Sequence, residues 1–143
     1  MGKELGLTRI DYFSCMDYST KINKELKPWV DNTLDKTVVD LFAGCGGLSL
    51  GFEAAVFKTV GYEMLEDASE TYRANLIGDC FTEKLHVDTE FPKAEVVIGG
   101  PPCQPFSVGG KQLGLKDARD GFPIFLSAIE RLEPEVFLFE NVR

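Results

Sequence analysis

The stretch that decides the fold is VVDLFAGCGG at residues 38–47. Its first half is a short apolar run typical of a buried strand, and its second half is a glycine-rich loop. Residues 48–56, which follow directly, are helical in composition. A strand that turns through glycines into a helix is the opening unit of a parallel sheet. The same alternation of strand and helix recurs along the rest of the chain.

Outward from this unit, apolar runs predict four more strands and helical spacing predicts three more helices. The strands are apolar without a period of two, which indicates a parallel sheet covered on both faces. We therefore predict an α/β fold of about five strands. The further strands are expected at 58–62, 84–87, 96–98 and 136–139, and the further helices at 20–26, 67–75 and 123–132.

Composition narrows the class of protein. The 143 residues are 44% hydrophobic, as expected for one globular core, and contain neither a membrane-length apolar run nor a signal peptide. We expect a cytoplasmic protein. A net charge of -8 means that nucleic acid either is not the partner or is gripped mainly by groups elsewhere. The four cysteines form no CxxC pair, so free thiols and no metal site are expected.

Polar residues follow the strands at their carboxyl ends, where parallel sheets bind ligands. The first glycine loop offers backbone amides at a helix start, Glu63 is placed to accept ribose hydroxyls, and Asp88 to accept an exocyclic amine. Together they indicate a nucleoside-bearing cofactor, although a tight turn with two solvated carboxylates is the plainer alternative. Ser49 stands where a dinucleotide fingerprint needs its third glycine, so that fingerprint is absent.

A second loop, GGPPCQPFS at residues 99–107, carries a candidate nucleophile. Cys103 follows two prolines at a strand end, which favours an exposed, reactive thiol over a buried, inert one. The single histidine, His86, lies on the preceding predicted strand, so a cysteine hydrolase is disfavoured. Glu140 ends the last strand, where a carboxylate can hold or protonate a ring nitrogen, unless it is simply solvated.

DLFAGCGG at 40–47, GGPPCQPFS at 99–107 and ENV at 140–142, in this order, resemble the DNA cytosine-C5 methyltransferases. The resemblance covers most of the chain, from residue 37 to 143. It implies the Rossmann-like parallel sheet of S-adenosylmethionine-dependent methyltransferases, here incomplete. It also implies transfer of a methyl group to C5 of a cytosine flipped out of double-stranded DNA. The bacterial character of the resemblance suggests a restriction–modification system with a cognate restriction endonuclease.

The resemblance also assigns the cofactor contacts. Phe42 would pack on the adenine, Glu63 would bind the ribose and Met64 would lie against the base. Asp88 would accept the adenine amine, but LHVDT at 85–89 departs from the family's Gly-Asp-Ile, and Asp79 is a rival. The residues implied in S-adenosylmethionine binding are Phe42, Ala43, Gly44, Gly46, Gly47, Leu48, Glu63, Met64, Asp88 and Pro102.

For catalysis, the resemblance implies that Cys103 attacks C6 of the cytosine while Glu140 holds N3 and the exocyclic amine. Residues 107–121 resemble the family's mobile active-site loop, with an ordinary solvated loop as the alternative. The residues implied in contacting the substrate or DNA are Gln104, Ser107, Lys111 and Arg119.

The family continues beyond the ENV strand with two more strands, a target-recognition region and a final helix. We therefore expect residues 1–36 to be an extension and 37–143 the N-terminal part of the catalytic domain. The chain would be a fragment or one subunit of a split enzyme with a complementing C-terminal partner. A non-catalytic cofactor-binding or partner-binding module would be expected to lack Cys103 or Glu140, and both are present. A nucleotide-dependent oxidoreductase fits the two loops poorly.

Overall fold

A computed structural model describes residues 20, 22–28, 35–102 and 121–141. Five strands form one sheet in the order β3-β2-β1-β4-β5, and each neighbouring pair is parallel. The predicted parallel α/β architecture is confirmed. The strands are β1 (Thr37–Leu41), β2 (Lys58–Glu63), β3 (Asp79–Thr82), β4 (Val96–Gly99) and β5 (Val136–Phe139).

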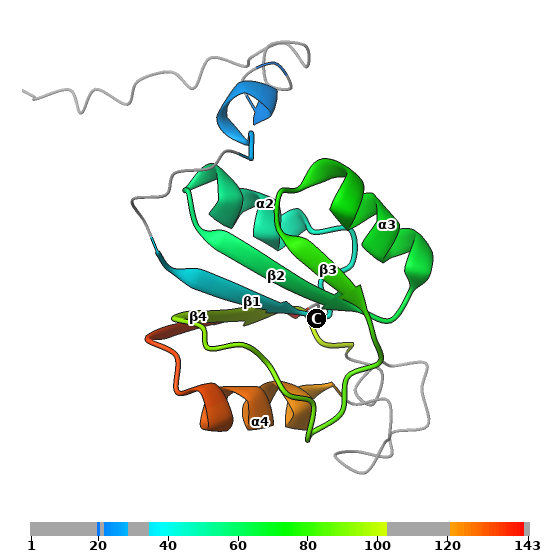
Figure 1. The fold of residues 1–143 in the computed structure, drawn as a ribbon, viewed down its shortest axis with the longest axis vertical. Helices are drawn as coiled ribbons and strands as arrows, with labels where there is room; N and C mark the ends of the chain where they lie inside the picture. The colour runs from blue at the N-terminus through cyan, green and yellow to red at the C-terminus, as the bar shows by residue number, and fades with distance from the viewer. Residues whose placement is uncertain (1–19, 21, 29–34, 103–120, 142–143) are drawn as a thin grey trace, which may run out of the picture.

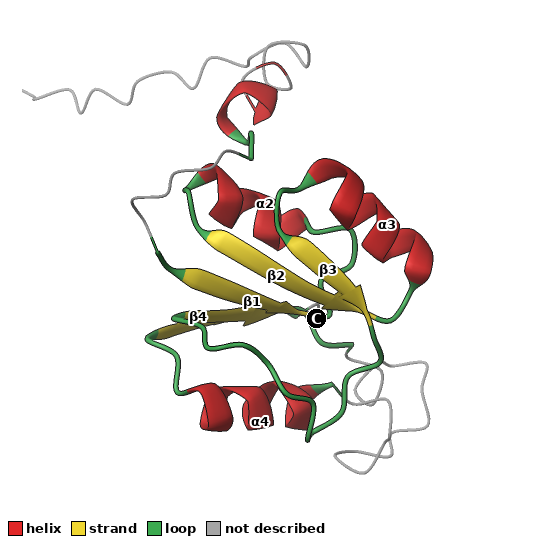
Figure 2. Ribbon diagram, in the orientation of Figure 1, coloured by secondary structure: helices red, strands yellow, loops and turns green. Residues whose placement is uncertain are grey.

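Helices cover the sheet on both faces (Figure 1). Helices α2 (Gly47–Ala54) and α3 (Glu66–Asn75) lie side by side on one face, and α4 (Phe122–Leu132) lies on the other, as Figure 2 also shows. Within 20–26, where a short helix is predicted, the described residues 20 and 22–25 are helical. In the described part of the chain, no helix has the length and apolar character needed to cross a membrane.

Alternating residues of β1 supply two apolar cores. Val39 and Leu41 pack in a cluster with Phe125 of α4, whereas Val38 packs with Ile98 and, on the α2 side, Leu48. The buried members of these clusters are at most 7% exposed. Each fully buried side chain of this size stabilises the fold by about 1.5–3 kcal/mol. The sheet is therefore held from both sides along its central strands.

The third strand differs from the prediction. Residues 84–87 form no strand, and β3 instead begins at Asp79 and ends at Thr82, with Tyr62 of β2 paired to Phe81. The prediction was wrong because Leu85 is apolar for another reason: it is 6% exposed and packs in the core on the α4 side. Being an edge strand, β3 buries only Cys80, so its sequence carries little apolar signal.

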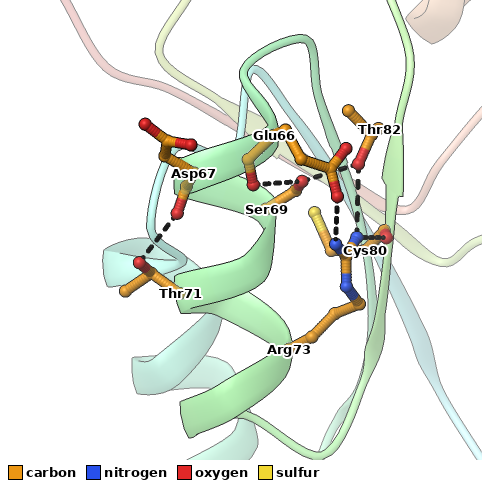
Figure 3. A network of polar contacts seen from close by, with 7 residues as sticks. All are labelled: Glu66, Asp67, Ser69, Thr71, Arg73, Cys80 and Thr82. Carbon is orange, nitrogen blue, oxygen red and sulfur yellow. Dashed lines mark hydrogen bonds and ion pairs between the residues drawn. The ribbon is translucent and has the colours of Figure 1, made fainter.

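Side chains of α3 hold β3 in place (Figure 3). One guanidinium nitrogen of Arg73 donates to the Cys80 carbonyl oxygen at 2.8 Å, and the other donates to Glu66 at 2.8 Å. The hydroxyls of Ser69 and Thr82 are 2.6 Å apart. These contacts attach the outer strand to its helix through polar groups, where an apolar core is thin.

Candidate functional site

The first loop, residues 42–47, begins where β1 ends and leads into α2. It starts by extending the sheet ladder, with the Ala43 amide donating to the Tyr62 carbonyl at 3.0 Å, and then turns as Gly46 donates to the Ala43 carbonyl at 2.9 Å. Phe42, Gly44 and Gly46 have φ of 60°, 55° and 87°. A left-handed conformation at Phe42 costs about 1–2 kcal/mol, so the surrounding structure must hold this turn.

Glu63 joins the end of β2 to this loop. Its side chain accepts the Gly44 amide at 3.0 Å on Oε2 and the Leu65 amide at 2.8 Å on Oε1. Each carboxylate oxygen retains a second lone pair, so both can still accept a ligand hydroxyl. Glu63 is 9% exposed and therefore lines the site from within the fold.

Open space borders the loop beside Glu63. A methyl group added at Gly44 or at Gly47 would meet no atom within 4 Å, and Met64 next to Glu63 is 62% exposed. Gly46 is different, because its added methyl would lie 2.6 Å from the Tyr72 ring. A ligand can therefore approach at Gly44 and Gly47, while Gly46 accommodates an aromatic ring of the protein.

The first loop meets the second at Phe42. A methyl group added at Gly121 would lie 2.8 Å from the tip of the Phe42 ring, 2.6 Å from Pro101 and 2.9 Å from Pro102. The start of α4, the Pro-Pro segment and the end of β1 thus come together at one edge of the sheet. Phe42 also packs against the core on the α4 side.

Glu140 lies at the same edge. Its amide donates to the Gly99 carbonyl at 3.0 Å, and a methyl group on Gly100 would lie 3.0 Å from its Oε2. The carboxylate is therefore beside a residue three positions before Cys103. The predicted residues Cys103, Gln104, Ser107, Lys111 and Arg119 lie outside the described part of the chain.

The two candidate acids for the adenine amine are placed differently. Asp88 is exposed in a turn whose backbone is held by α4: Ser127 donates to the Val87 carbonyl at 2.7 Å and Arg131 to the Thr89 carbonyl at 2.8 Å. It does not end a strand. Asp79 begins β3, level with Val60, about 10 Å from the carboxyl edge at the usual rise per residue. The role of either acid in cofactor binding stays a prediction.

Sequence reasoning missed a buried polar pair beneath the first loop. Asp40 on β1 is 1% exposed and accepts the hydroxyl of the fully buried Ser49 at 2.7 Å. Burial raises the pKa of the Asp40 carboxyl to about 7, against the lowering effect of the hydrogen bonds from Ser49. An acid inside the otherwise apolar run VVDLF was the signal that could have found it.

The first loop, the described start of the second loop (residues 99–102), and the acids Glu63 and Glu140 thus share one sheet edge. A family model described as C-5 cytosine-specific DNA methylase matches residues 36–143. The chain belongs to this family. Curated relatives include the Type II methyltransferase M.AplI of Arthrospira platensis, 53% identical over 90% of this chain. Another is M.PspPI of a Psychrobacter species, 41% identical over 80% of this chain.

This family member spans about a third of the length of those relatives, 37% of M.AplI and 29% of M.PspPI. Among solved structures, it resembles a tRNA (uracil-54, C5)-methyltransferase of Pyrococcus abyssi in complex with S-adenosyl-L-homocysteine. The TM-score is 0.55 at 18% identity, over 88% of this chain and 27% of that chain. At that identity the likeness concerns the fold, which is the Rossmann-like sheet of the S-adenosylmethionine-dependent methyltransferases.

Proposed function

We propose that residues 37–143 are the N-terminal, cofactor-binding part of a DNA cytosine-C5 methyltransferase that belongs to a bacterial restriction–modification system. The observation that carries the proposal is the Glu63 carboxylate, which is bonded to the Gly44 amide at 3.0 Å and borders open space along the first loop. Family membership and the Type II methyltransferase relatives support the same reaction.

The residues at this edge fit S-adenosylmethionine. Glu63 would accept the ribose hydroxyls through its free lone pairs, and Gly44 and Gly47 leave room for close approach of the ligand. Exposed Met64 would cover the adenine, with Phe42 and Pro102 near its other side. Bound there, the cofactor supplies the methyl group; the remaining proposed contacts, through Ala43, Gly46, Leu48 and Asp88, are with the same ligand.

The reaction would use Cys103 and Glu140 on the flipped cytosine. The Cys103 thiolate would attack C6 and form a C–S bond, while Glu140 would donate a hydrogen bond to N3 and accept one from the exocyclic amine. After C5 has taken the methyl group, loss of its proton and release of Cys103 restore the C5–C6 double bond. The Glu140 carboxylate beside Gly100 supports this pairing, because the nucleophile follows on the same short segment.

The finished enzyme would need more protein than this chain. Val136, Phe137 and Leu138 of β5 are 58%, 56% and 43% exposed, unlike the residues of β1 and β4. We infer that C-terminal protein, in the same chain or as a complementing subunit, packs on β5 and brings the groups that grip double-stranded DNA. The net charge of -8 supports the inference that the groups which bind DNA belong to that further protein, because this chain has an excess of acidic residues. A bacterial cytoplasm suits the free thiols of Cys45 and Cys80, and a cognate restriction endonuclease would act on the same DNA.

The cofactor assignment is tested by calorimetric titration of this chain with S-adenosylhomocysteine. Glu63→Gln should weaken binding at least tenfold, or about 1.4 kcal/mol, because its NH2 group cannot accept a ribose hydroxyl. Glu70→Gln, an exposed acid on α3, is the matched control and should bind normally. For a 2′,3′-dideoxy analogue, the chain with Glu63 and the Glu63→Gln variant should bind equally. A full Glu63→Gln effect on that analogue would show that Glu63 acts only through Gly44.

The nucleophile is tested by covalent trapping on DNA that carries 5-fluorocytosine, in the complete or complemented enzyme. Cys103→Ser should abolish the trapped complex, because a hydroxyl without a neighbouring base is a poor nucleophile. Burial raises the pKa of Cys80 to about 11, so that thiol stays protonated and Cys80→Ser should still trap. Trapping by Cys103→Ser, or its loss in folded Cys80→Ser, would contradict the assignment.

A further inference from the structure

The base of the first loop is closed by a hydrogen bond between two buried side chains. Asp40 precedes the loop on β1 and Ser49 follows it in the first turn of α2. The Ser49 hydroxyl donates to Asp40 Oδ2 at 2.7 Å. The bond therefore fixes how far the end of β1 lies from the start of α2, which is the span that residues 42–47 must cross.

The carboxyl also lies at the start of α2, where it meets the first turn through Ser49. Gly46 is the N-cap residue of α2 and has no side chain to accept an amide of the first turn. The first amides of a helix have no partner within it, and a carboxylate near them is favourable. Asp40 reaches this position from the neighbouring strand, so one side chain serves both β1 and α2.

Burying the Asp40 carboxyl inside the fold is energetically unfavourable. On the same face of β1, Val38 packs in an apolar cluster with Val96 and Ile98, and an apolar residue at position 40 would extend that cluster. Burying a carboxyl there carries a penalty that the bonds from Ser49 must offset. The charge of Glu63 adds to the penalty. Fold stability alone therefore does not account for an acid at this position.

A fixed aromatic ring supports the loop beside this pair. Tyr72 of α3 is fully buried, and methyl groups at Gly46 and Gly61 would lie 2.6 and 2.8 Å from its ring. Its hydroxyl donates to Thr59 at 2.9 Å, and the Thr59 hydroxyl donates to Glu53 at 2.6 Å. The ring is thus held at both ends, with the loop resting on it at Gly46.

We propose that Asp40 and Ser49 are positioning residues, which hold the first loop in the backbone shape that binds the cofactor without touching the cofactor themselves. The proposal rests on the proposed function, in which this loop binds S-adenosylmethionine. The loop needs such support because Phe42 and two glycines adopt positive φ, a shape that a free segment does not keep. The Asp40–Ser49 bond and Tyr72 supply that support from the protein side, and Gly44 and Gly47 stay open to the ligand.

The test compares Ser49→Ala with Ser69→Ala in the 143-residue chain. Both serines are fully buried and both hydroxyls are bonded, but the Ser69 hydroxyl contacts Thr82 on the outer strand and not a residue that flanks the first loop. Ser49→Ala should weaken S-adenosylmethionine binding at least fivefold and speed amide hydrogen exchange at residues 43–48. Ser69→Ala should change neither, even if it lowers the melting temperature equally. Unchanged loop exchange in Ser49→Ala, or equal loss of affinity in both variants, would overturn the proposal.

Two Asp40 variants test whether the hydrogen bond to Ser49, and not merely the volume of the side chain, is needed for cofactor affinity. Asp40→Asn keeps an oxygen that can accept from Ser49 and should retain affinity within about twofold, whereas Asp40→Ala should lose at least fivefold. Equal affinity in these two variants would overturn the role of the Ser49 bond. If the chain with Asp40 and Ser49 bound no S-adenosylmethionine at millimolar concentration, the proposed function would fail. Amide hydrogen exchange at residues 43–48 would then still show whether Asp40 and Ser49 hold the first loop in shape.

Discussion

At the scale of single residues, two glycines of the first loop are needed for different physical reasons. Gly44 has φ 55° with open space beside it, so its freedom serves the turn and the approach of a ligand. Gly46 has φ 87° and also lies against Tyr72, where any side chain would collide with the ring. A glycine-rich motif that indicates one ligand site therefore includes a residue required for packing.

This difference predicts the stability of two alanine variants. Gly46→Ala combines a positive φ with a contact of 2.6 Å to the Tyr72 ring and should lower the free energy of unfolding by about 2–4 kcal/mol. Gly51→Ala, in α2 with nothing within 4 Å, should raise it by up to about 1 kcal/mol. Urea denaturation measures both. A Gly46→Ala value within 0.5 kcal/mol of the unmodified chain, taken as roughly the noise for a surface change, would contradict the packing argument.

At the scale of elements, sequence pattern predicted the three inner strands and one edge strand, β5, and misplaced the other edge strand, β3. Apolar runs located β1, β2 and β4, because central parallel strands must be apolar throughout, and they located β5 because its residues are apolar although exposed. β3 was not predicted because its position depends on polar contacts from α3, such as the hydrogen bond from Arg73 to the Cys80 carbonyl. The spacing of apolar residues along the sequence does not reveal such contacts. The side chain that resembled a strand residue, Leu85, is buried under the sheet instead.

The candidate site divides in the same way. Glu63 and Glu140 could be expected at the sheet edge because each follows or ends a strand that its apolar run identifies. Asp88 was expected there for the same reason and instead lies in a turn held by α4, since its strand does not exist. Asp40 and Ser49 could not be paired from sequence, because their contact depends on the exact path of the loop between them. Local pattern therefore predicts strand ends but not the bonds that cross a turn.

At the scale of the whole molecule, the two ends of the sheet are finished differently. β3 is covered by α3, and its Phe81, although 50% exposed, stacks on Tyr62 at 5.4 Å between ring centroids. β5 turns Phe137 and Phe139 toward Phe125 of α4, at 6.4 and 5.2 Å. Its other face carries Val136 and Leu138, which alternate with those rings. Val136 and Leu138 are 58% and 43% exposed, so the described residues leave that second face of β5 open.

The exposed face of β5 predicts how the chain behaves in solution. Apolar side chains along an edge strand promote association, so the 143-residue chain should self-associate as its concentration rises in analytical ultracentrifugation. The double variant Val136→Thr/Leu138→Thr keeps strand-forming residues and should weaken association at least tenfold. Ile77→Thr/Val87→Thr is the matched control, since Ile77 and Val87 are 53% and 54% exposed but lie outside the strands. If both pairs weaken association equally, scattered apolar exposure is the cause. If the unmodified chain stays monomeric at every concentration, the exposed face of β5 does not promote association. The inference that further protein packs on β5 then loses its support.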